Sequence, residues 1–182
     1  STELSLITRV FTSENEEDDA PLGPFLDADR NSNLLDWQSA LSLNKKYELF
    51  SVNASIETAR ARRYQLKNAR KFRWYIADLN IGKLKFTVPL NTKEKFIFGV
   101  ETERAHMDTQ DQYNSYDFKV SSSSSFYSYT NNTIKNLFLD GSFRSNHHDL
   151  FGLSTTYRLA ASYIIFDSGF RLHSSYGTGY RA

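Results

Sequence analysis

The fold class is decided by the stretch STTYRLAASYIIF, residues 154–166. Its odd-numbered positions from Tyr157 to Ile165 are apolar or aromatic, whereas Arg158, Ala160 and Ser162 lie between them. An apolar residue at every second position is typical of a β-strand that turns one face away from water. The stretch therefore predicts a long strand, well above the roughly five or six residues common in soluble proteins.

The same alternation recurs along the chain and predicts about nine strands. Their expected ranges are Leu4–Thr12, Leu35–Leu43, Tyr47–Ala59, Phe72–Leu90, Lys95–His106, Ser121–Asn131, Lys135–Ser145, Ser154–Phe166 and Phe170–Tyr180. In the fourth range, Asp78, Asn80 and Gly82 interrupt the apolar positions, so two shorter strands with a turn at 79–82 are an alternative.

The expected connections alternate in length. Short turns are predicted at 44–46, 91–94, 131–133 and 167–169. Longer polar connections are predicted at 13–34, 60–71, 107–120 and 146–153. Short turns at one end and long loops at the other are typical of outer-membrane barrels, and strands of ten or more residues match the roughly 9–11 needed to cross a bilayer at a tilt. The sequence predicts an all-β, antiparallel, up-and-down transmembrane β-barrel segment.

Composition excludes several classes of protein. Mean hydropathy is −0.54, and no apolar run approaches the roughly 20 residues of a membrane helix. The 22 basic and 21 acidic residues give no reason to expect a nucleic-acid partner. Cysteine is absent, which removes zinc–thiolate sites and disulfides. No catalytic constellation is visible, so we do not expect an enzyme.

The strand count bears on domain organisation. Nine is odd, whereas bacterial single-chain barrels have an even number of strands and are closed, because an open edge is not tolerated in lipid. The last alternating stretch, 170–182, stops while still in strand rhythm. We therefore expect residues 1–182 to form one partial barrel domain, without a plug domain and without the closing carboxy-terminal strands.

Alternation also assigns charged residues to one side. If one face of the barrel meets lipid, charges belong on the opposite, lumen-facing side, because a charge at mid-membrane costs about 2–4 kcal/mol. The residues predicted to face the lumen are Glu101, Glu103, Asp140, Arg144, Arg158, Arg171 and His173. Solvated lumen residues that form salt bridges are the simplest interpretation of this set.

Several motifs resemble TonB-dependent outer-membrane receptors. They are DGSFR (140–144), HDLFG (148–152), TYRLAASY (156–163) and RLHSSYGTGYRA (171–182), with weaker echoes in LDWQ (35–38) and FGVETER (98–104). The Pro and Leu-rich segment that would come next in the family is missing, and residues 60–79 match no part of the pattern. The resemblance implies a plugged, 22-stranded barrel, of which this chain supplies under half the strands.

The family resemblance implies a function. Such receptors import a ferric siderophore, cobalamin or haem through the outer membrane of a Gram-negative bacterium, energised by the TonB complex through the plug. The expected outer loops are 13–33, 60–71, 107–116 and 146–151. Within them, the residues chosen as ligand contacts are Arg62, Arg63, Tyr64 and Tyr113. A passive porin or adhesin-like barrel, and a soluble β-sandwich with an apolar interior, remain alternatives.

Two clusters invite a metal interpretation. The acidic loop from Glu14 to Asp19, followed by Asp27, Asp29 and Asn31, gathers oxygen ligands of the kind that calcium prefers, and calcium-ordered outer loops occur in cobalamin receptors of the resembled family. A solvated loop is the alternative. His147-His148-Asp149 has ligand chemistry, but adjacent residues on a strand point to opposite sides, so a polar loop is favoured. The serine run 121–125 is read as strand rather than linker.

Overall fold

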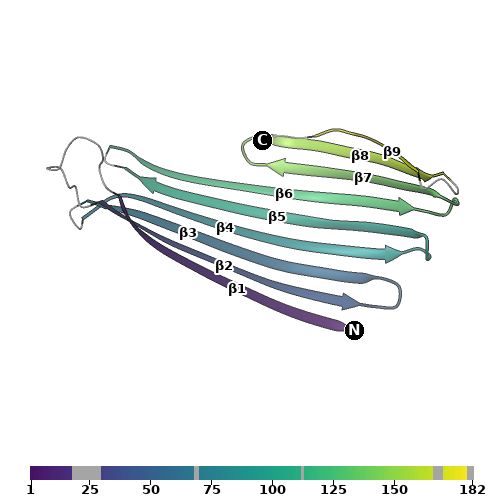
Figure 1. The fold of residues 1–182 in the computed structure, drawn as a ribbon, viewed down its shortest axis with the longest axis horizontal. Helices are drawn as coiled ribbons and strands as arrows, with labels where there is room; N and C mark the ends of the chain where they lie inside the picture. The colour runs from purple at the N-terminus through teal and green to yellow at the C-terminus, as the bar shows by residue number, and fades with distance from the viewer. Residues whose placement is uncertain (18–29, 68–69, 112, 166–169, 180–182) are drawn as a thin grey trace.

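The computed structural model describes residues 1–17, 30–67, 70–111, 113–165 and 170–179. These residues form nine strands in one antiparallel sheet in sequence order, each paired with the next (Figure 1). The strands are β1 (Thr2–Glu17), β2 (Arg30–Lys46), β3 (Ser51–Lys67), β4 (Arg70–Pro89), β5 (Glu94–Gln110), β6 (Ser115–Asn131), β7 (Leu137–His148), β8 (Gly152–Ile164) and β9 (Arg171–Gly177). The predicted all-β, up-and-down fold is confirmed. Within these ranges, no helix is long and apolar enough to span a membrane.

The predicted long connections are wrong over much of their length. β1 continues to Glu17, β3 to Lys67 and β5 to Gln110, so only 111–114 and 149–151 separate the strands of two hairpins that were expected to carry long loops. The physical reason is that the backbone ladder continues whatever the polarity of the side chains, whereas the sequence prediction ended each strand where apolar alternation ended. β4 is one unbroken strand of 20 residues, so the alternative with a turn at 79–82 is also wrong.

The register separates two faces of the sheet. Leu4 pairs with Leu43, Leu43 with Ala54, Ala54 with Leu84 and Leu84 with Val100, so all five side chains lie on one side, which we call the apolar face. The opposite side, the polar face, carries the intervening residues. Examples in register across it are Ser5, Ser42, Ser55, Lys83 and Glu101.

The described residues form no hydrophobic core. No apolar side chain among them is buried, and members of the apolar face are largely exposed, for example Leu4 at 69% and Ile56 at 66%. A continuous exposed apolar surface of this extent requires a cover of lipid or protein. The soluble β-sandwich is therefore not formed by this sheet, because its apolar side chains are not enclosed between two layers.

On the apolar face, the positions of the first charged residue on successive strands follow a line that slopes across the sheet. His147 on β7 is in register, through six strand pairs, with Leu6 on β1. Relative to that row, the first acidic or basic residue lies two residues further on β5 (Arg104), four on β4 (Asp78) and eight on β1 (Glu14). At about 3.3 Å per residue and about 4.8 Å per strand, the line rises about 26 Å over about 29 Å, an angle of about 42°. On β3 the first charge (Arg60) lies four residues beyond the row. Two strands depart from the line: on β6 the first charge (Lys119) lies four residues beyond the row, and on β2 no charged residue occurs on this face from Leu41 to Asn31.

The slope is that expected of strands crossing a bilayer, since barrel strands tilt by about 35–45°. On β5 the apolar face is free of charge between Glu94 and Arg104, about 33 Å along the strand. At a 42° tilt this length projects to about 25 Å, the height of the apolar band in outer-membrane barrels. The dimensions of the uncharged band thus fit a hydrocarbon layer.

Aromatic side chains gather where the apolar band approaches the turn between β4 and β5, at 90–93. Phe86 stacks on Phe98 with ring centroids 4.9 Å apart, and Phe96 lies 5.7 Å from Phe98. Beside them, Tyr129 donates its hydroxyl to Glu94 over 2.8 Å. Rings with a polar tip at the edge of an apolar band are typical of a membrane–water interface.

Candidate functional site

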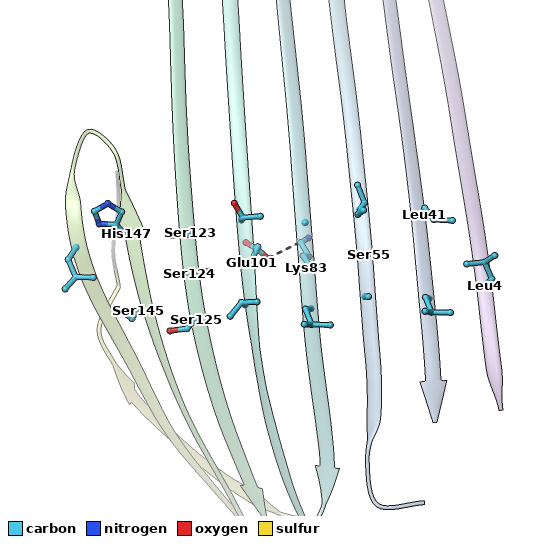
Figure 2. A pocket seen from close by; sticks show the side chains of 18 residues that line it. Leu4, Leu41, Ser55, Lys83, Glu101, Ser123, Ser124, Ser125, Ser145 and His147 are labelled. Atoms are coloured by element: carbon cyan, nitrogen blue, oxygen red, sulfur yellow. Dashed lines mark ion pairs between the residues drawn. The ribbon is translucent and has the colours of Figure 1, made fainter. Parts of the chain in front are cut away.

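An ion-pair row crosses the polar face at mid-height. Arg144 on β7 donates to Glu101 on β5 over 2.9 Å, and Lys83 on β4 lies 3.9 Å from the other oxygen of Glu101 and 3.4 Å from Glu57 on β3. The pairs join neighbouring strands, except that Glu101 and Arg144 are one strand apart. All the side chains lie on the same face, because side chains of a strand alternate between its two faces. The Lys83–Glu101 pair is drawn as a dashed line in Figure 2. This face therefore offers fixed charges of both signs to whatever fills the space beside it.

All seven residues predicted to face the lumen lie on the polar face by register. The structure brings Glu101 and Arg144 together, and it places Arg171 against Ser162, which is the partner of His173 in the β8–β9 ladder. Asp140 accepts a hydrogen bond from Thr130 over 3.2 Å. They therefore share one side but form no single cluster, and lining of a lumen stays a prediction.

We expect a measurable coupling between Glu101 and Arg144. The side chains are 24% and 43% exposed, so solvent screening limits the coupling to about 0.5–1 kcal/mol. The measurement is a double-mutant cycle with Glu101→Gln and Arg144→Gln, scored by the free energy of unfolding in lipid vesicles. The Glu57–Lys83 pair, with both partners about 40% exposed, is the control and should couple more weakly. Strictly additive single effects at Glu101 and Arg144 would contradict the pairing.

A second feature of the polar face was missed at the sequence level. A hollow of about 520 Å³ lies toward the end of the sheet where β5 is followed by β6, lined on this face by four alanines (Ala59, Ala61, Ala77, Ala105) together with Tyr75, Met107, Phe118, Leu79, Asp36 and Gln38. Asp36 carries a buried oxygen without a hydrogen-bond partner. The alanines are visible in the sequence, but only the register of the paired strands shows that they lie side by side.

The apolar face carries an open groove of about 790 Å³ (Figure 2). Its lining includes leucines such as Leu41 and Leu84 and small residues such as Ala54, Gly82 and Ser123. The groove arises because small residues leave space beside larger partners, since Ala54 pairs with Leu84 and Gly82 with Ile56. Most of its lining belongs to the uncharged band, where hydrocarbon is the expected surrounding, and Lys83, Glu101 and His147 also border it.

The residues chosen as loop contacts occupy different places. Arg62, Arg63 and Tyr64 are not in a loop but within β3, so that placement is wrong, for the reason given above for the long connections. Arg62 and Tyr64 lie on the apolar face and Arg63 on the polar face, because successive residues of a strand alternate. Tyr113 lies in the turn between β5 and β6 and is 84% exposed. A ligand-binding role for the four residues stays a prediction.

The two metal hypotheses fare differently. Asp27 and Asp29 lie outside the described residues, and Asn31 lies on β2 opposite Glu16 and Leu66, so calcium binding stays a prediction. His147 and His148 close β7 on opposite faces, since His147 pairs with Ser123 and His148 with Ser122. Across the described ranges, no three His, Asp or Glu side chains converge as a metal site would require.

Asp149 instead closes the β7–β8 turn. The hydroxyl and the backbone N–H of Ser121 donate to its carboxylate over 2.6 Å and 3.0 Å, and these bonds hold the pKa of Asp149 below its ordinary value. Because the folded-state pKa is depressed, the stabilisation of the turn is present above the unfolded-state pKa of about 3.9. It is lost as pH falls through the lower folded-state pKa.

We therefore expect Ser121→Ala to return the pKa of Asp149 toward its ordinary value, because the larger of the two hydrogen-bond contributions comes from the hydroxyl. Titration of the labelled Asp149 carboxyl carbon by NMR measures the shift directly. Ser123→Ala, one pleat along β6 and paired with His147, is the control and should leave the titration unchanged. An unaltered midpoint in Ser121→Ala would show that the hydroxyl does not hold the carboxylate.

Together, a curved run of tilted strands with one uncharged band and one charged face defines a segment of a β-barrel wall. No family model matches the chain, and no curated protein matches it. Among solved structures, it is similar to the siderophore receptor PirA from Pseudomonas aeruginosa, with a TM-score of 0.69 and 14% sequence identity over 76% of this chain. The similarity covers 25% of the receptor chain, so the chain spans about a quarter of the protein that it matches. At this identity the likeness concerns the fold.

Proposed function

We propose that this chain is part of the wall of an outer-membrane barrel, in a Gram-negative bacterium, that takes up a scarce ligand by TonB-dependent transport. The observation that supports it is the uncharged band on one face, with the slope and height of a bilayer-crossing barrel, in a sheet similar to part of a siderophore receptor. Membrane lipid is then the partner of the apolar face. A ferric siderophore is the favoured ligand, ahead of cobalamin and haem, because of that similarity.

In this proposal the polar face lines the path of the ligand. The ion-pair row of Glu57, Lys83, Glu101 and Arg144 supplies charges that a plug could contact at low desolvation cost, because the four are already partnered. The hollow beside Tyr75 and Phe118 is an apolar recess on the same side, suited to an aromatic or aliphatic part of a ligand. The plug and the TonB-contacting segment would come from parts of the protein outside this chain.

The test is growth of a strain that lacks the gene, on a panel of ferric siderophores, haem and cobalamin as sole sources. We expect growth to fail on one source, to return with the wild-type gene, and to fail equally when TonB is removed. A passive porin or adhesin-like barrel, the second candidate, would support uptake without TonB or support none. Growth on every source without the gene would contradict transport.

A further inference from the structure

The first six residues of β6 lack a neighbouring strand on one side. β6 pairs with β5 along its whole length, from Ser115 to Asn131, whereas its pairing with β7 begins only at Ser122. Figure 1 accordingly shows β6 extending well past the end of β7. We call residues 115–120 the free edge. At about 3.4 Å per residue they form about 20 Å of strand with one unpaired side, in the part of the chain that the structure describes.

The backbone groups of the free edge point away from β5 at every second residue. The carbonyl oxygen of Ser121 accepts a hydrogen bond from the N–H of Asp149 over 3.1 Å, and the N–H of Ser121 donates to the Asp149 carboxylate over 3.0 Å. Backbone groups of successive residues in an antiparallel strand point to alternate sides. Those of Lys119, Asp117 and Ser115 therefore point to the same side as those of Ser121, where no described residue bonds them.

The side chains on the two faces of the free edge differ in character. On the polar face, Tyr116 and Phe118 are 57% and 46% exposed, and Phe118 borders the hollow of about 520 Å³. On the apolar face, the carboxylate of Asp117 lies 2.7 Å from Nε2 of His106 and accepts a hydrogen bond from Lys119 over 3.3 Å. Charged side chains discourage indiscriminate pairing of edge strands. The two exposed aromatic rings, in contrast, offer apolar surface to a partner that fits.

The chemistry of the free edge identifies the kind of partner. An unpaired strand edge is a template to which an extended peptide adds as a further strand, with affinity from main-chain hydrogen bonds and specificity from alternate side chains. We propose that the free edge binds an extended segment of a partner protein, in line with β7. The segment places an apolar side chain beside Phe118 and an acidic one beside Lys119, whose side chain is 69% exposed.

The position of the free edge favours a separate protein as the source of the segment. On β6 the uncharged band ends before Lys119, so under the proposed function the free edge lies in water outside the bilayer. The turns nearest to it, 111–114 and 149–151, are too short to fold across it. Two copies of this chain would pair their identical edges antiparallel, which would invert one copy in the membrane. This step rests on the proposed function, because it requires the sheet to span a bilayer.

The test measures amide hydrogen exchange by NMR in the intact detergent-solubilised protein, with a synthetic peptide of alternating valine and glutamate as the probe. We expect the N–H groups of Lys119 and Asp117 to exchange rapidly in the free protein. Saturating peptide should slow both by about tenfold or more, because a hydrogen-bonded amide is protected. The N–H groups of Phe118 and Val120, which point to β5, are the internal control and should be protected in both states.

The peptide itself supplies the matched control, with the wild-type protein unchanged. Its glutamates lie opposite Lys119 and Asp117, so N-methylation of the glutamates removes the N–H groups that bond the free edge. N-methylation of the valines removes N–H groups that point away from β6. We expect the first methylated peptide to bind about tenfold more weakly or not at all, and the second to bind as the unmodified peptide does.

Lys119→Pro tests the same edge from the protein side, since it removes an N–H that the β5 ladder does not use. We expect this variant to lose the protection of Asp117 by the peptide, whereas Lys119→Gln, which keeps the N–H, retains it. Equal binding of the two methylated peptides would overturn the inference, as would a lack of protection by the unmodified peptide.

Slow exchange at Asp117 and Lys119 without peptide would also overturn the inference, because another part of the protein or a second copy would then occupy the free edge. Insertion into vesicles and growth on the ligand panel are followed for the same proteins. If the protein inserts and supports growth but the free edge binds no peptide, the inference fails while the proposed function stands. If the protein does not insert into a bilayer, the proposed function fails.

Discussion

Leu41→Arg is expected to lower the free energy of unfolding from a bilayer by about 2–4 kcal/mol, the cost of a basic residue near the middle of the lipid face of a barrel. Leu41 lies on β2 between Leu6 and Ile56 in the uncharged band and is 43% exposed in the isolated sheet. Under the proposed function, that exposed surface meets hydrocarbon. Urea unfolding from lipid vesicles, followed by tryptophan fluorescence, measures the difference.

The matched control is the next residue. Ser42 lies on the polar face between Ser5 and Ser55, so Ser42→Arg places the same side chain on the same strand but in water. We expect Ser42→Arg to change stability by less than about 0.5 kcal/mol. Equal losses for the two variants would show that the faces are not in different solvents, and a larger loss for Ser42→Arg would reverse the assignment.

Gly99→Val is expected to destabilise the sheet by about 1–3 kcal/mol through overpacking. Gly99 is buried on the polar face, and a Cβ there would lie less than 3.0 Å from both the carbonyl oxygen of Leu84 and the ring of Phe126. Phe126 is its partner across the β5–β6 ladder, so the aromatic ring covers the glycine. The backbone oxygen cannot move away without breaking the strand pairing.

Gly141→Ala is the comparison for Gly99→Val. Its added Cβ would meet only the Leu159 side chain, at an ordinary 3.4 Å, so we expect little change in the unfolding midpoint. Gly99→Ala should already cost measurable stability because its Cβ meets the same atoms as that of valine. A tolerated Gly99→Val, with an unchanged unfolding midpoint, would contradict the close packing of these two strands.

The sequence was sufficient to predict the number of strands and the face of the sheet on which each side chain lies. Alternation at positions such as Leu159 and Arg158 predicted both, because a period of two is a local property of each strand. It was insufficient for strand ends, since the polar residues of β3 after Thr58 continue the backbone ladder without an apolar signal. Arg62–Tyr64 were placed in a loop for that reason.

Contacts between strands could not be predicted from the sequence, for a different reason. The pairing of Glu101 with Arg144 joins residues 43 positions apart, and the hollow beside Phe118 depends on which alanines of different strands lie in register. Register is set by the whole series of hairpins. The register therefore cannot be inferred from the sequence of a single strand.

The most direct test of the account is which solvent meets each face. The chain has no native cysteine, so single cysteines can be placed at successive positions from 80 to 88 on β4 and spin-labelled in the bilayer-embedded protein. We predict that labels at even positions, including 84 and 86, are reached by oxygen dissolved in lipid, whereas labels at odd positions are reached by a water-soluble nickel reagent. Accessibility without a two-residue period, or with the opposite parity, would contradict the assignment of the apolar face to lipid.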